Sequence, residues 1–188
     1  MARRKRIYLA GPEVFLPNAK AVGADKKRLA AEAGFEGCFP LDTAVDLDGL
    51  TDQEKAARIY QACADMMRTC DLAIANCTPF RGVSMDSGTA YEIGFMRALG
   101  RPVFGYSCAA GSLAERSAAY RRTGQLPWDS DRADVEIENF GHAENLMIAV
   151  AVEQSGGALT AAASTVAMAD LTGYRQCLEQ ARRAFGLA

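Results

Sequence analysis

The chain has 188 residues, 49% of them hydrophobic, so it can bury a core and we expect residues 1–188 to form a single domain. Its 21 basic and 23 acidic residues are intermixed and leave a formal net charge of −2, which argues against a dedicated nucleic-acid-binding protein. No segment is long and apolar enough for a signal peptide or a membrane span, so we expect a cytoplasmic protein.

Spacings typical of metal centres are missing from the sequence. The six cysteines include no CxxC pair and His142 is the only histidine, which argues against a zinc site or a Cys–His nucleophile. The chain also lacks GxGxxG and GxxxxGK, the two common nucleotide fingerprints. We therefore expect reduced thiols and no metal.

The first part of the chain alternates between expected strands and helices. Residues 6–10 predict a strand that ends at Gly11 and Pro12, and the loop over residues 13–17 is expected to face a ligand. A helix should start at Asn18 and stop at Gly34, before a second strand over residues 35–41. Thr51 should cap a helix to about residue 69, with an apolar side formed by Ala56, Ile59, Cys63, Met66 and Met67.

The rest of the chain continues this alternation. Residues 71–76 and 101–106 predict a third and a fourth strand, with helical spacing over residues 91–99 between them. Residues 107–141 are the least regular part, and we expect them to act as a lid or an oligomer contact. Helices should follow over residues 144–152 and 171–185. The pattern predicts an α/β fold, a doubly wound parallel sheet of four to five strands flanked by helices.

Two carboxylates follow the third strand, at the edge where parallel sheets bind ligands. Asp86 lies in a polar loop that starts after Asn76, and Glu92 is expected in the first turn of the next helix. The order Thr89-Ala-Tyr-Glu92 also fits a capping box, in which the glutamate only satisfies a backbone donor. The local sequence leaves both interpretations of Glu92 open, chemistry or capping.

Several segments of the chain resemble the nucleoside 2-deoxyribosyltransferase family, whose fold is flavodoxin-like, a Rossmann-like arrangement. They occur in the family's order, and Asp-x-Gly-x-x-x-Glu-x-Gly together with Asn-Leu-Met is a fairly specific pattern. The segments are Tyr8-Leu-Ala-Gly-Pro12, Pro40-Leu-Asp42, the strand beginning at Asp71, Asp86-Ser-Gly-Thr-Ala-Tyr-Glu-Ile-Gly94 and Asn145-Leu-Met147. The loop Thr78-Pro-Phe-Arg-Gly82 resembles a subgroup found in bacteria and kinetoplastids.

The resemblance implies a role for each matching residue. Glu92 would attack C1′ of a 2′-deoxynucleoside, Tyr8 would orient that carboxylate, and Asp86 would bind the sugar 5′-hydroxyl. Asn145 from a neighbouring subunit would join Asp86, and Met147 would line the same site. The further substrate-binding candidates are Gly11, Pro12, Asp42, Phe80, Arg81 and Gly88.

The implied activity is exchange of the base of a 2′-deoxynucleoside, with retention, through a covalent deoxyribosyl-Glu92 intermediate in nucleotide salvage. Its partners would be 2′-deoxynucleosides and free nucleobases, without cofactor, metal, nucleic acid or membrane. Residues 146–152 are apolar almost all round, and such a helix has to be covered on more than one side. We therefore expect a homo-oligomer, at least a dimer, in which a neighbouring subunit completes each site.

One position departs from the family pattern. Relatives carry an acid eight residues before the position of Asp71 that helps to protonate the leaving base, and this chain has Cys63 there. Asp65 cannot simply replace it, because two residues turn a helix by about 200°. The proton donor is therefore unassigned, with Asp42, a water molecule and the base's own protonation as the candidates.

Other interpretations of the same residues stay open. Tyr8 could be a core residue, Asp86 could complement a helix dipole, and Asn145 could cap a helix. A hydrolase of 2′-deoxynucleoside 5′-monophosphates would share the fold, although a carboxylate at Asp86 would repel a phosphate. A non-catalytic nucleotide-sensing module is the third possibility, supported by the missing acid at Cys63.

Overall fold

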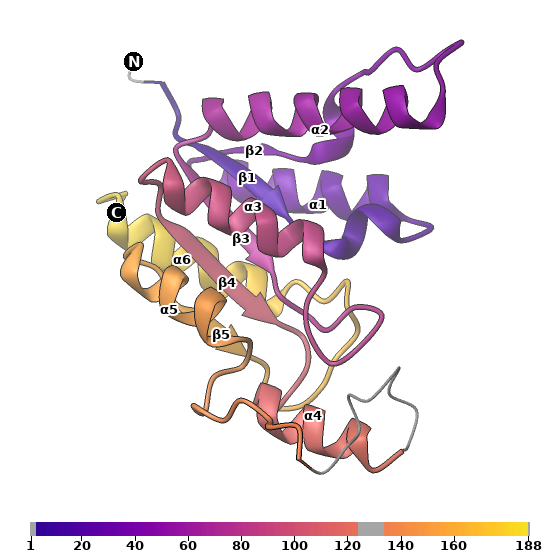
Figure 1. Ribbon diagram of the computed structural model, residues 1–188. Coiled ribbons are helices and arrows are strands. Elements are labelled where there is room, and N and C mark those ends of the chain that lie inside the picture. Colours follow the sequence, from indigo (N-terminus) through magenta and orange to yellow (C-terminus); the bar gives the residue numbers. More distant parts are fainter. Residues whose placement is uncertain (1–2, 124–133, 188) are drawn as a thin grey trace.

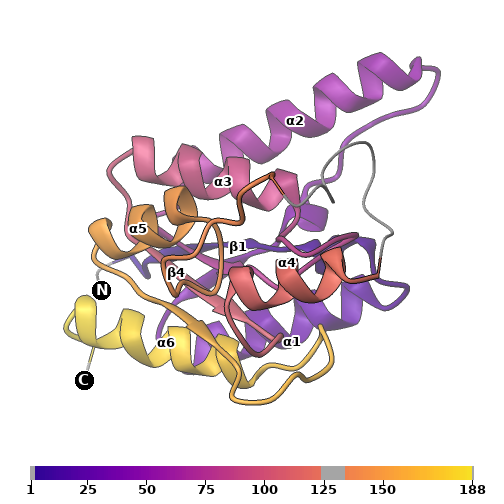
Figure 2. The same ribbon diagram turned by 60° about the horizontal axis from the view of Figure 1, so that its bottom comes forward.

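A computed structural model describes residues 3–123 and 134–187 as a parallel five-stranded sheet with helices on both faces (Figures 1 and 2). The strand order is β2-β1-β3-β4-β5, which confirms the predicted doubly wound sheet. The strands are β1 (Arg6–Ala10), β2 (Glu36–Cys38), β3 (Leu72–Asn76), β4 (Val103–Ser107) and β5 (Leu159–Ala161). The helices are α1 (Ala19–Glu32), α2 (Asp52–Thr69), α3 (Ser87–Ala98), α4 (Leu113–Arg121), α5 (Leu146–Gln154) and α6 (Thr172–Ala184), with short 3-10 helices η1 (Pro12–Phe15) and η2 (Pro40–Asp42).

The two faces of the sheet are covered by different helices. Helices α1 and α6 lie on one face, and α2, α3 and α5 lie on the other (Figure 2). Side chains alternate along β1, so that Ile7 and Leu9 enter the core beneath α1 and α6 while Tyr8 and Ala10 enter the core beneath α2, α3 and α5. This alternation turns Tyr8 toward the helix that carries Glu92.

Two expected boundaries differ from the structure. The second strand, expected over residues 35–41, pairs only from Glu36 to Cys38, because Pro40 lacks a backbone donor and begins η2. Helix α2 begins at the predicted Thr51 cap, but Ala56 and Ile59, expected on its buried side, are exposed. The first half of α2 reaches past its neighbouring helices (Figures 1 and 2).

Part of the segment expected to be irregular, residues 107–141, forms helix α4. Ser112 and Glu115 close a capping box at its start: the Ser112 backbone nitrogen donates to Glu115 Oε2 at 2.7 Å, and the Glu115 nitrogen donates to Ser112 Oγ at 3.2 Å. The helix has no buried residue and so no apolar stripe in the sequence. Residues 124–133, within the expected lid, lie outside the described residues.

Across residues 3–123 and 134–187, no helix combines the length and the apolar character needed to cross a membrane.

Candidate active site

Strand β1 and helix α3 bring Tyr8 and Glu92 together. The Tyr8 hydroxyl donates to Glu92 Oε1 at 2.5 Å, and Tyr8 itself is fully buried. Helix α3 begins at Ser87 with Asp86 as its N-cap, which places Glu92 in the second turn. The predicted first-turn position and the capping-box interpretation of Glu92 are therefore wrong.

The surroundings of Glu92 favour its neutral form. Burial, and to a smaller extent the negative charges of Asp86 and Glu13, raise the pKa of Glu92 to about 7, although the Tyr8 hydrogen bond acts in the opposite direction. Burial, followed by the charge of Glu92, also raises the pKa of Tyr8, so Tyr8 keeps its proton and stays a donor. A carboxylate of this kind changes ionisation near neutral pH, as a group used in acid–base or nucleophilic chemistry would.

Asp86 caps helix α3, where the sequence suggested only that it could complement a helix dipole. Its Oδ2 accepts from the backbone nitrogen of Thr89 at 2.9 Å and from the Thr89 hydroxyl at 3.2 Å. A Cβ at Gly88 would come within 3.0 Å of the same oxygen, so glycine leaves room for this cap. Within the described residues, no hydrogen bond involves Asp86 Oδ1.

The turn after β1 is held by a buried ion pair that the sequence did not reveal. Glu13, expected in a ligand-facing loop, points inward and pairs with Lys26, and it also accepts from Asn76 Nδ2 at 2.8 Å and from the Tyr106 hydroxyl at 3.0 Å. Burial would raise the pKa of Glu13, but the Lys26 charge and these hydrogen bonds outweigh it and lower the pKa. A Cβ at Gly11 would lie 2.0 Å from Glu13 Oε2, so Gly11 is needed for this close approach.

An aromatic stack joins the loop after β1 to the loop after β3. The rings of Phe15 and Phe80 lie 5.3 Å apart at 13°, and the Arg81 guanidinium lies over both, 5.0 Å and 4.6 Å from their centroids. Arg81 has φ 57°, the only positive value at a non-glycine residue in the described chain. Phe15 is 55% exposed, and the sequence placed it in the loop expected to face a ligand without singling it out. The stack offers a flat surface at the carboxyl edge of the sheet.

Other predicted residues make no hydrogen bond to Glu92 within the described chain. Asp42 accepts from the Phe39 backbone nitrogen at 3.1 Å and pairs with Lys27 at 2.6 Å. Asn145 caps α5: its Oδ1 accepts from the Met147 nitrogen at 3.0 Å. The Met147 side chain is 71% exposed at the start of α5.

Cys63, the residue at the expected acid position, does lie at the site. Burial raises the pKa of its thiol, while the Tyr8 hydroxyl lowers it and the charge of Glu92 raises it further. All three groups thus interact, and the thiol keeps its proton at neutral pH. Within the described residues, no cluster of three or more His, Cys, Asp or Glu side chains is arranged to hold a metal ion.

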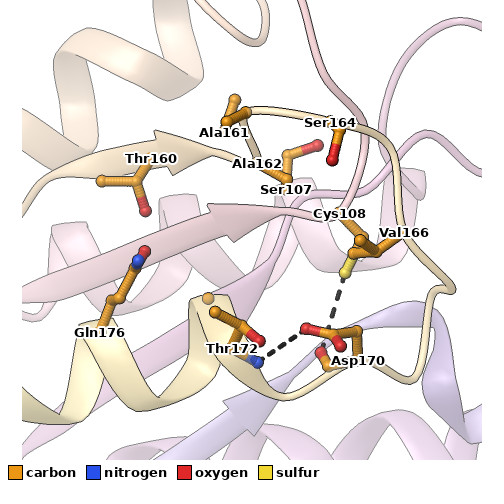
Figure 3. Close-up of a pocket in the computed structure, with 12 residues that line it drawn as sticks. Ser107, Cys108, Thr160, Ala161, Ala162, Ser164, Val166, Asp170, Thr172 and Gln176 are labelled. Carbon is orange, nitrogen blue, oxygen red and sulfur yellow. Dashed lines mark hydrogen bonds between the residues drawn. The ribbon is translucent and has the colours of Figure 1, made fainter.

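A separate cavity of about 370 Å³ opens at the carboxyl ends of β4 and β5 (Figure 3). Asp170 lies at its floor, where its Oδ1 accepts from the Thr172 nitrogen at 2.8 Å and its backbone oxygen accepts from Cys108 Sγ at 3.8 Å. None of the predicted site residues lines it. The candidate active site is therefore the Tyr8–Glu92 pair and its surroundings.

Known proteins resemble this chain in sequence and in fold. The sequence model of the nucleoside 2-deoxyribosyltransferase family matches residues 7–147. A 2-deoxyribosyltransferase structure from Leishmania mexicana is 32% identical, with a TM-score of 0.58 over 77% of this chain and 85% of that one. An uncharacterised protein of Schizosaccharomyces pombe is 30% identical over 80% of this chain and 78% of its own length. A conserved protein from Enterococcus faecalis V583, 19% identical with a TM-score of 0.55 over 95% of this chain and 99% of its own, shares the fold.

Proposed function

Because the chain belongs to the nucleoside 2-deoxyribosyltransferase family, we propose that it exchanges the base of a 2′-deoxynucleoside for another base. The observation that carries the proposal is the half-buried Glu92 carboxylate, held by the Tyr8 hydroxyl at 2.5 Å and with its pKa raised to about 7. The relative from Leishmania mexicana, itself a 2-deoxyribosyltransferase, supports the same activity. We place the reaction in cytoplasmic nucleotide salvage.

In the proposed mechanism, ionised Glu92 attacks C1′ as the bond from C1′ to the base nitrogen breaks. The positive charge that develops on the sugar is stabilised by the carboxylate and then trapped as a glycosyl ester. The incoming base attacks C1′ from the face the first base left, which frees Glu92 and retains configuration. Tyr8 holds one carboxylate oxygen by its hydrogen bond and leaves the other for the sugar.

The surroundings of Glu92 supply the proposed contacts to substrate. Asp86 binds the 5′-hydroxyl through the oxygen that is not used for the helix cap. Phe80 and Arg81, with Phe15, offer the base a stacking surface beside Gly11 and Pro12. Asn145 and Met147 make no hydrogen bond to Glu92 within the described residues, and we propose that they act in a neighbouring subunit's site.

The leaving base needs a proton, and neither Asp42 nor the Cys63 thiol is well suited to give it. Asp42 forms an ion pair with Lys27, which makes it a poor proton donor. We propose that it instead contacts the polar edge of the base. The Cys63 thiol has a raised pKa and is a weak acid. We therefore propose that water or the base's own protonation supplies the proton.

The decisive assay incubates the protein with 2′-deoxyinosine and adenine and separates the products by chromatography. We expect 2′-deoxyadenosine and hypoxanthine to accumulate in equal amounts. Free deoxyribose without a new nucleoside would mean a hydrolase, and loss of base from 2′-deoxyinosine 5′-monophosphate alone would mean a nucleotide hydrolase. No turnover of any substrate would favour the sensing module.

The variant Glu92→Gln separates catalysis from capping. It should abolish exchange without lowering the melting temperature at pH 7, because the half-buried carboxylate, whose pKa is raised, costs folding energy to ionise and the amide does not. The matched control is Glu54→Ala, which breaks a true capping box on α2. The control should lose about 0.5–1 kcal/mol of stability and keep activity. Near-normal exchange by Glu92→Gln would remove Glu92 as the nucleophile.

A further inference from the structure

A second glutamate, Glu144, is buried just before α5 and has no place in the proposed chemistry. Its side chain is 1% exposed, and its carboxylate is well supplied with donors. Oε1 accepts from the Ser84 hydroxyl at 2.6 Å and from the Asn145 backbone nitrogen at 2.9 Å, and Oε2 accepts from the Met85 backbone nitrogen at 2.9 Å. Burying a carboxylate is costly unless it is fully hydrogen-bonded, so this arrangement joins two chain segments firmly.

Arg116 of α4 extends the same cluster. Its Nη2 lies 3.8 Å from Glu144 Oε2, and its donors reach three backbone oxygens. Nε donates to Val83 at 3.0 Å, Nη2 donates to Ala143 at 2.6 Å, and Nη1 donates to Gly111 at 2.9 Å. Arg116 and Glu144 therefore hold the loop over residues 83–85 against residues 143–145, because each of the two side chains hydrogen-bonds to both segments.

The two residues proposed to bind the 5′-hydroxyl, Asp86 and Asn145, lie at these fixed points of the chain. Asp86 comes directly after Met85, whose nitrogen Glu144 holds, and Asn145 is itself held through its own nitrogen. We infer that Glu144, with Arg116, is a positioning residue that sets the 5′-hydroxyl end of the substrate site. The inference rests on the proposed function. In the proposed oligomer Asn145 serves the neighbouring subunit, so one Glu144 carboxylate supports two sites.

The chemistry of the cluster requires a carboxylate. Glutamine at position 144 keeps one acceptor oxygen, but in either orientation its amide group would direct a donor at a backbone donor, the Met85 N–H or the Asn145 N–H. Ser84→Ala is a milder change, because it removes one hydroxyl and leaves both backbone contacts of Glu144 in place.

The test compares a 2′-deoxynucleoside with its 2′,5′-dideoxy analogue, which lacks only the 5′-hydroxyl. The readout is kcat/KM for the 2′-deoxynucleoside divided by kcat/KM for the 2′,5′-dideoxy analogue, both measured in the base-exchange assay. Glu144→Gln should lower this ratio about tenfold, the effect of losing one hydrogen bond to a charged group, toward the ratio of Asp86→Ala. Ser84→Ala should lower it less. A purely structural role would reduce the amount of active protein and leave the ratio unchanged.

Glu153→Gln is the matched control, since Glu153 is exposed on the same helix α5 and should leave the ratio at its wild-type value. If Glu144→Gln does not fold, Ser84→Ala and Arg116→Lys carry the test. A wild-type ratio in these variants, or a ratio near one in the wild type, would overturn the inference. Absence of exchange in the wild type would instead overturn the proposed function.

Discussion

A carboxylate and a phenol that share a hydrogen bond in a buried site control each other's ionisation. Glu92 is neutral in part at neutral pH because burial outweighs the stabilising donor, Tyr8. The ionised form is the nucleophile, so the proposed activity should fall as pH drops through the pKa of Glu92. Wild-type kcat/KM should therefore rise through about pH 7 and reach a plateau above it.

Replacing Tyr8 with phenylalanine should move this rise to higher pH. The Tyr8 hydrogen bond lowers the pKa of Glu92, so its loss raises that pKa, by about one unit for a bond to a charged group. The measurement is kcat/KM between pH 5 and 9. Tyr174→Phe is the control, because it removes another buried hydroxyl, one that donates to the Lys26 backbone oxygen on the opposite face of the sheet. If kcat/KM rises at the same pH in Tyr8→Phe as in the wild type, Tyr8 does not act on the titrating group.

Single residues were predictable from the sequence where a motif marked them and not where a distant partner decided their position. Tyr8 and Glu92 come from segments 84 residues apart, and the resemblance paired them where local patterns favoured a core role for Tyr8 and left Glu92 open between chemistry and capping. The roles of Glu13 and Glu144 depend on partners far along the chain, Asn76 and Ser84, which no spacing rule connects. Burial of a charged residue is set by the fold, so the sequence alone could not reveal it.

At the scale of elements, the start of α3 combines a structural and a proposed functional role in one residue. Asp86 caps the helix through Oδ2, and serine is an equally good N-cap. Asp86→Ser should therefore keep α3 intact while removing the charge. We expect weaker use of 2′-deoxynucleosides and better tolerance of their 5′-monophosphates, because a phosphate no longer faces a carboxylate in a partly desolvated site.

The comparison needs a variant that loses the cap as well as the charge. Asp86→Ala should also lower stability by about 0.5–2 kcal/mol, which the melting temperature reports. Discrimination between nucleoside and nucleotide that stays the same in Asp86→Ser would remove Asp86 from the 5′ end of the site. Steady-state kinetics on 2′-deoxyinosine and its 5′-monophosphate provide the measurement.

Elements were predictable in proportion to their burial. Strands β1, β3 and β4 and helix α6 were found close to their observed bounds, because each buries a regular apolar pattern. Helix α4 was missed because it buries no residue and so shows no apolar pattern. Strand β5 was missed because its three residues are too few to show an alternating pattern. The apolar side of α2 was placed correctly at Met67, but Ile59 in its first half is 47% exposed.

For the whole molecule, the layer formed by α2, α3 and α5 leaves large apolar side chains uncovered. Ile59, Tyr60, Tyr91 and Met147 are between 47% and 71% exposed, and the hydroxyls of Tyr60 and Tyr91 are 2.8 Å apart across α2 and α3. Exposed apolar surface over several elements is typical of an interaction site. The same layer carries Glu92 on α3 and the predicted neighbour-site residues at the start of α5. A second copy of the chain on this layer would cover the apolar side chains and complete the proposed sites together.

Subunit mixing tests this arrangement directly. Glu92→Ala and Asn145→Ala subunits should each be inactive alone, and mixing them under conditions that allow exchange should restore activity. In a dimer, random mixing pairs one subunit of each kind about half the time, which gives one site with both changes and one site with neither. The control mixes each variant with itself at the same total concentration. Light scattering at the assay concentration should show at least a dimer. A fully active monomer there would contradict the shared site, because residues at the start of α5 would then have to reach Glu92 within their own chain.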